Sequence, residues 1–132
     1  MSVGFAYLDL ARGMKEHLWF VIAKPDPDER VIVSVTTRDA ETTDLTCILI
    51  PGDHPFIEHE SVIFYRKADA VAVNYLETIK RRGDLVEKPR VADALIDRIR
   101  LGAFRSQFTP NYVKKAIDDC FWRPAKTLPP ET

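Results

Sequence analysis

The side chains of this sequence that could exchange protons or bind a metal are concentrated in one stretch, residues 47–61. It holds one of the two cysteines, Cys47, two of the three histidines, His54 and His59, and three carboxylates. A Pro-Gly pair directly before Asp53 and His54 indicates a turn, and loops held by strands are where functional residues gather. We therefore expect a site here.

Three interpretations of this stretch remain open. In the first, His54 and His59 act as general acid and base, because imidazole can do both near neutral pH. In the second, Cys47, His54 and His59 bind a metal with His17 or a carboxylate as fourth ligand, although the spacing matches no standard zinc pattern. In the third the role is structural: Asp53 and His54 bond to loop amides, Phe56 fills the core and Cys47 is a small buried apolar residue.

A second candidate is Thr36-Thr37-Arg38, at the end of a β-branched run. Two hydroxyls and a guanidinium can hold a phosphate, because arginine offers a planar fork of donors. The alternative is that the threonines suit a strand and Arg38 is a solvated turn residue.

Basic residues recur in the second half, including Arg81 and Arg82. Such a series could follow a nucleic-acid backbone. Aspartates are interleaved with it, and helix faces of mixed charge are usually just solvated. Both interpretations stay open.

The 132 residues suffice for one domain, and the composition, 45% hydrophobic and 30% charged, excludes disordered, collagenous and membrane-spanning classes. The net charge of −1 hides an asymmetry. Residues 1–76 carry 7 basic and 12 acidic groups, whereas residues 77–132 carry 12 basic and 8 acidic ones. A nuclease site in the first half would therefore need cations brought from the second half or from another subunit.

The elements that must position these residues read as strands first and helices second. Apolar or β-branched runs bounded by Pro, Gly or charged residues predict strands at 18–23, 31–37, 45–50, 61–65 and 70–73. Helical spacing predicts helices over 75–82, 90–104 and 110–121. Short strands at this spacing favour a small antiparallel, SH3-like barrel followed by two to three helices, an α+β fold.

We expect one domain over residues 1–122, β-rich in 1–73 and helical in 74–122, with a flexible tail at 123–132. The apolar rows on the last two helices exceed what a small barrel needs to cover. They favour an interaction module or a homodimer as an alternative function.

No secretory signal or membrane span is visible, and two cysteines form no disulfide framework, so we expect a cytoplasmic protein that does not enter a membrane. There is no glycine-rich phosphate loop, dinucleotide turn or nucleophile elbow, and no cofactor is expected.

His17-Leu18-Trp19-Phe20-Val21-Ile22-Ala23, a loop, and then Val31–Thr37 resemble the first half of the MazF/PemK-like toxins. The resemblance covers about residues 15–50. The stretch Gly-Asp-His-Pro-Phe-Ile-x-His-x-Ser at 52–61 resembles divergent bacterial relatives of that family and not the toxins proper.

The resemblance implies an SH3-like barrel and an endoribonuclease of a toxin–antitoxin system that cuts single-stranded RNA without metal, with an antitoxin as protein partner. His17 stands where the family has an arginine, and Thr36 and Thr37 stand at its strand-end hydroxyl. The candidate catalytic residues are His17, Thr36, Thr37, His54 and His59. The candidate RNA contacts are Arg38, Arg66, Lys67, Arg81 and Arg82.

Overall fold

A computed structural model describes residues 1–12 and 17–120 of the chain, and the predicted tail at 123–132 lies outside them. In order, the elements are β1 (Ala6–Asp9), the 3-10 turn η1 (Leu10–Arg12), β2 (Leu18–Asp26), β3 (Glu29–Thr37), β4 (Ile48–Leu49), β5 (Ser61–Ile63), the 3-10 turn η2 (Tyr65–Lys67), β6 (Asp69–Ala72), α1 (Val73–Arg81), β7 (Leu85–Lys88), α2 (Asp93–Arg105) and α3 (Asn111–Asp118). The predicted α+β class is confirmed.

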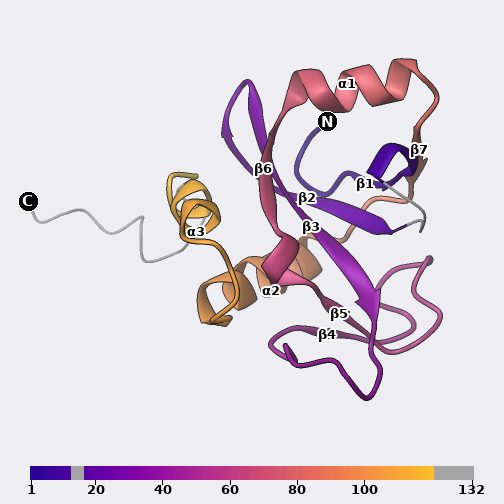
Figure 1. Ribbon diagram of the computed structural model, residues 1–132, viewed down its shortest axis with the longest axis vertical. Coiled ribbons are helices and arrows are strands. Elements are labelled where there is room, and N and C mark those ends of the chain that lie inside the picture. The colour runs from indigo at the N-terminus through magenta and orange to yellow at the C-terminus, as the bar shows by residue number, and fades with distance from the viewer. Residues whose placement is uncertain (13–16, 121–132) are drawn as a thin grey trace, which may run out of the picture.

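The strands form one antiparallel sheet in the order β4-β5-β3-β2-β1-β7, with β6 also paired to β3 (Figure 1). The long strand β3 binds β2 along one edge. Its other edge pairs with β6 through Glu29–Ile32 and with β5 through Val35–Thr37. Within the described residues β4 and β7 do not pair with each other, so the sheet is open where barrel closure was predicted.

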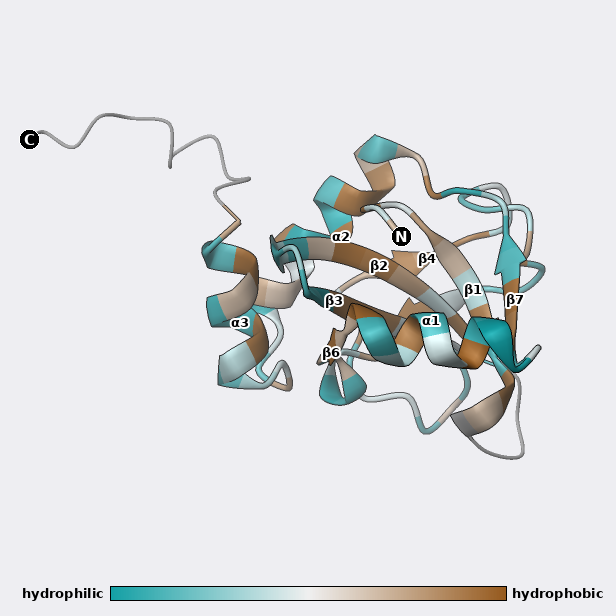
Figure 2. Cartoon of the chain, turned by 90° about the horizontal axis from the view of Figure 1, so that it is seen from above, coloured by the Kyte–Doolittle hydropathy of each residue, from teal (hydrophilic) through white to brown (hydrophobic). Residues whose placement is uncertain are grey.

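The sheet lies between two helical layers, with α1 against one face and α2 against the other (Figure 2). Alternation along β2 explains this, since Leu18 and Phe20 face the cluster of α2 and α3 while Trp19 and Val21 face that of α1. Because both faces are covered, the strand reads as a continuous apolar run rather than an alternating one.

The apolar rows of the last two helices are buried inside the chain. Leu95, Ile99 and Ile117 lie in the same cluster as β2 and β3. The observation that favoured a shared interface is therefore accounted for by packing within one chain. Among the large apolar side chains of α2 and α3, Leu101 and Tyr112 are exposed.

Candidate functional site

Three adjoining cavities meet around Thr36 near the C-terminal end of β3, and we call them together the Thr36 groove. Thr36 lines all three. We name them by their most basic side chains: the histidine pocket (about 340 Å³), the lysine pocket (about 280 Å³) and the arginine pocket (about 250 Å³). The groove contains four of the five predicted catalytic residues.

The histidine pocket is lined by His17, Thr36, Thr37 and His59. Strand register brings them together from distant parts of the sequence. Leu18 pairs with Val35, which sets His17 beside the end of β3, and Ser61 pairs with Thr37, which does the same for the segment carrying His59. Two imidazoles and two hydroxyls therefore line one cavity.

The lysine pocket adjoins it through His17 and Thr36 and adds Lys67 and the buried carboxylate of Asp9. Tyr75 of α1 donates a hydrogen bond to Asp9 Oδ2 at 2.7 Å, and the Ala11 amide donates to Asp9 Oδ1 at 2.9 Å. These bonds fix the carboxylate on the wall of the pocket.

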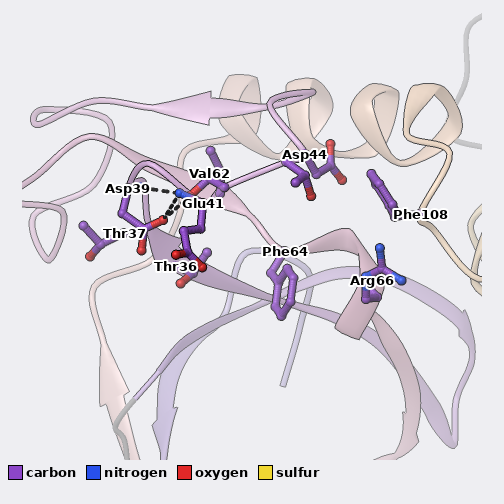
Figure 3. Close-up of a pocket in the computed structure, with 11 residues that line it drawn as sticks. Thr36, Thr37, Asp39, Glu41, Asp44, Val62, Phe64, Arg66 and Phe108 are labelled. Carbon is purple, nitrogen blue, oxygen red and sulfur yellow. Dashed lines mark hydrogen bonds between the residues drawn. The ribbon is translucent and has the colours of Figure 1, made fainter.

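The arginine pocket extends the groove on the other side of Thr36 (Figure 3). Figure 3 shows Thr36 at one end, Arg66 and Phe108 at the other, and Phe64 between them. The Arg66 guanidinium lies 4.4 Å from the centre of the Phe108 ring. Such contacts hold a cation and an aromatic surface together.

His54, the fifth predicted catalytic residue, lies outside these linings and is buried. Its Nε2 is 2.6 Å from the Pro89 carbonyl oxygen, and the Phe56 amide donates to its Nδ1 at 3.1 Å. A carbonyl only accepts and an amide N–H only donates, so Nε2 carries the proton. Both ring nitrogens of His54 therefore form hydrogen bonds with backbone groups. Of the three interpretations of this stretch, the geometry of His54 fits the structural one.

The rest of the loop around His54 is also explained by structure. Gly52 has φ +106°, a conformation that other residues rarely adopt, and the Asp53 carboxylate accepts bonds from the Ile50 amide at 2.9 Å and from Arg98 at 3.0 Å. The predicted core position of Phe56 is wrong, because Phe56 is 42% exposed and Ile57 is the buried neighbour.

The predicted metal site at Cys47, His54 and His59 is not formed. Throughout residues 1–12 and 17–120, no group of three or more His, Cys, Asp or Glu side chains is placed to hold a metal ion. Burial raises the pKa of the Cys47 thiol, with nearby Arg98 opposing the shift, so the thiolate needed for metal binding is disfavoured.

The five predicted RNA contacts separate into three groups. Arg66 and Lys67 line the groove. Arg38 lies just beyond β3 and forms an ion pair of 2.9 Å with Glu60, joining this strand end to the segment before β5. Arg81 and Arg82 lie at the C-terminal end of α1 (Figure 1). Neither residue lines any of the three pockets.

Several other cations of the helical half have structural partners. Arg90 donates to the Val3 carbonyl at 2.6 Å, Arg98 to the Ile48 carbonyl at 3.2 Å and Arg100 to the Ile22 carbonyl at 2.6 Å. They attach the second half of the chain to the sheet. The positive charge of this half is thus partly a structural feature.

The groove also contains residues that the sequence patterns did not indicate: Asp9, Trp19, Glu41, Phe64 and Phe108. The strand β1, which carries Asp9, was not predicted, nor was β7. The Phe-Tyr-Arg-Lys run at 64–67 was the one available signal, an aromatic next to two cations.

Comparisons with protein-family models, with curated proteins and with solved structures gave no match. In the described part of the chain, no helix has the length and apolar character needed to cross a membrane.

Proposed function

We propose that this protein binds single-stranded RNA in the Thr36 groove and cleaves it without a metal ion. The observation that carries the proposal is the histidine pocket, where His17 and His59 line one cavity with the hydroxyls of Thr36 and Thr37. The resemblance of residues 15–50 to the MazF/PemK-like toxins is a second support, and it makes an antitoxin a proposed partner.

The chemistry proposed is an internal transesterification. One imidazole accepts the proton of the ribose 2′-hydroxyl as its oxygen attacks the adjacent phosphorus. The bond from phosphorus to the 5′-oxygen breaks, and the other imidazole, protonated, gives that oxygen a proton. The products are a 2′,3′-cyclic phosphate and a 5′-hydroxyl. One imidazole has gained a proton and the other has lost one, and the reaction needs no oxidant or metal ion.

The remaining groups of the groove suit the substrate. Lys67 lines the pocket that shares His17 and Thr36, so its ammonium group is available to the phosphate that reacts there. Donors aimed at developing charge are a major source of rate enhancement. Phe64, which is half-buried, lines the same pocket, and aromatic surfaces favour unpaired bases by stacking.

The experiment is to incubate the purified protein with an end-labelled RNA of mixed sequence, with and without a metal chelator. We expect cleavage in both conditions and fragments ending in 2′,3′-cyclic phosphate and 5′-hydroxyl. An intact RNA would remove the nuclease proposal. Fragments with a 5′-phosphate would show a different mechanism, one that does not use the 2′-hydroxyl.

A further inference from the structure

The arginine pocket is not used by the cleavage chemistry, yet it opens from the same threonines, Thr36 and Thr37. We infer that it binds a guanine base next to the phosphodiester that is cut. This inference rests on the proposed function and adds the base for which the groove would be selective. It is carried by one aromatic wall, one carboxylate, and one guanidinium that lies over the Phe108 ring; neither charged group has a side-chain hydrogen bond or ion pair among the described residues.

The wall consists of Phe64 and Phe108, both half-buried and so partly accessible from the cavity. Phe64 also lines the lysine pocket, so the aromatic surface continues from the proposed phosphate position into the arginine pocket. A base stacked on an aromatic side chain is a general mode of single-strand recognition. Stacking alone does not select among bases.

Selectivity requires polar groups without protein partners. Glu41 and Arg66 are exposed, and within the described residues neither forms a hydrogen bond through its side chain or an ion pair. The other carboxylates are occupied: Asp39 accepts bonds from the Glu41 amide at 2.8 Å and the Thr42 hydroxyl at 3.3 Å, and Asp44 accepts one from Ser106 at 2.7 Å. Glu41 and Arg66 are therefore available to a ligand.

Guanine has one edge that matches each of these two groups. Its N1–H and N2–H₂ are neighbouring donors that match the two oxygens of a carboxylate, and its O6 and N7 are neighbouring acceptors that match a guanidinium. Adenine lacks the O6 acceptor, and uracil offers a single N–H. Cytosine has neighbouring acceptors in O2 and N3 but only the amino group as donor, so it has no pair of donors for the carboxylate.

The test measures binding without cleavage, by fluorescence anisotropy, with 2′-O-methyl pentanucleotides that are uridine except at the centre. We expect a central guanosine to bind roughly tenfold more tightly than adenosine or uridine. Inosine, which lacks the N2 amino group, should fall in between. In Glu41→Gln the preference should fall to less than about threefold, with uridine binding unchanged. The matched control is Glu77→Gln, an exposed carboxylate on α1, which should keep the full preference.

The outcomes separate this inference from the proposed function. Equal binding of the guanosine and adenosine oligonucleotides would overturn the guanine pocket, while cleavage of mixed RNA would still support the nuclease. A full guanosine preference in Glu41→Gln would also overturn the guanine pocket, because the Glu41 carboxylate would then not be the group that recognises the base. If no oligonucleotide binds and no RNA is cut, both fail together.

Discussion

His54 donates a hydrogen bond of 2.6 Å to the carbonyl oxygen of Pro89, 35 residues further along the chain. This contact joins the loop before β5 to the segment between β7 and α2, and it gives the histidine a structural function. Its ring also lies 5.4 Å from that of Phe20, in the core.

We predict that His54→Ala lowers the free energy of unfolding by about 2–3 kcal/mol, since it removes a buried ring from the core and leaves the Pro89 carbonyl and the Phe56 amide without their partner. His59→Ala, at an exposed position, should change it by less than about 0.5 kcal/mol. Urea unfolding of both variants measures the difference. Equal stability of the two would show that the contact with Pro89 contributes little.

RNA cleavage should depend on the histidines in the opposite way. His17→Ala and His59→Ala should each slow cleavage by about a hundredfold or more, because each removes one proton-transfer group. The double variant should cleave RNA only slightly more slowly than the slower of the two single variants, since the two histidines act as a unit. Cleavage is followed on labelled RNA at a temperature where all variants are folded. Rates within tenfold of the wild type would exclude both residues from the mechanism.

The salt dependence of RNA binding tests which cations contact the backbone. Lys67→Ala should reduce the slope of log affinity against log salt by about 0.7, the value for one phosphate contact with a single strand. Arg81→Ala and Arg82→Ala, on the end of α1, should leave it unchanged. A reduced slope in the α1 variants would instead extend the binding surface to that helix.

Gly102 lies where α2 crosses Tyr65, and a Cβ there would contact the Tyr65 hydroxyl and lie 3.1 Å from its Cζ and 3.3 Å from Cys47 Cβ. Gly102→Ala should therefore destabilise the protein by about 1–3 kcal/mol, although alanine is the better helix former. Tyr65→Phe removes the hydroxyl that the new methyl meets, but it also removes the 2.7 Å bond from that hydroxyl to the Ile99 carbonyl. The two substitutions together should therefore destabilise the protein by less than the sum of their separate effects. If Gly102→Ala instead stabilised the protein, the contact between α2 and Tyr65 would have room for a methyl group.

Stability should fall at alkaline pH. Burial raises the pKa of the Cys47 thiol and of the Tyr65 phenol, so both stay protonated in the folded chain while the unfolded chain releases their protons. The free energy of unfolding should then decline from about pH 8.5 upward, at up to about 1.4 kcal/mol per pH unit for each group. Urea unfolding at about pH 7, 9 and 10 measures the slope. In Cys47→Ala the free energy of unfolding should fall less steeply with pH just above pH 8.5. An unchanged slope would show that groups other than Cys47 cause the alkaline loss of stability.

Local patterns predicted the helices well. The expected segments 75–82, 90–104 and 110–121 overlap α1, α2 and α3, because amphipathic spacing is a local property. The runs at 18–23 and 31–37 likewise correspond to β2 and β3. By contrast β1 and β7, four residues each, carry too little periodicity to stand out. They are strands because they pair with each other across nearly 80 positions of sequence.

The sequence by itself determined the α+β class, the order of most elements and the residue types available for proton transfer and cation contacts. Only the tertiary structure decided which of those residues meet. Strand register places His17, Thr36 and His59 around one cavity. Hydrogen bonds to two backbone groups hold His54 in the core, away from that cavity. Both outcomes depend on pairings between distant segments, whose geometry is not encoded in the spacing of residues along one strand or loop.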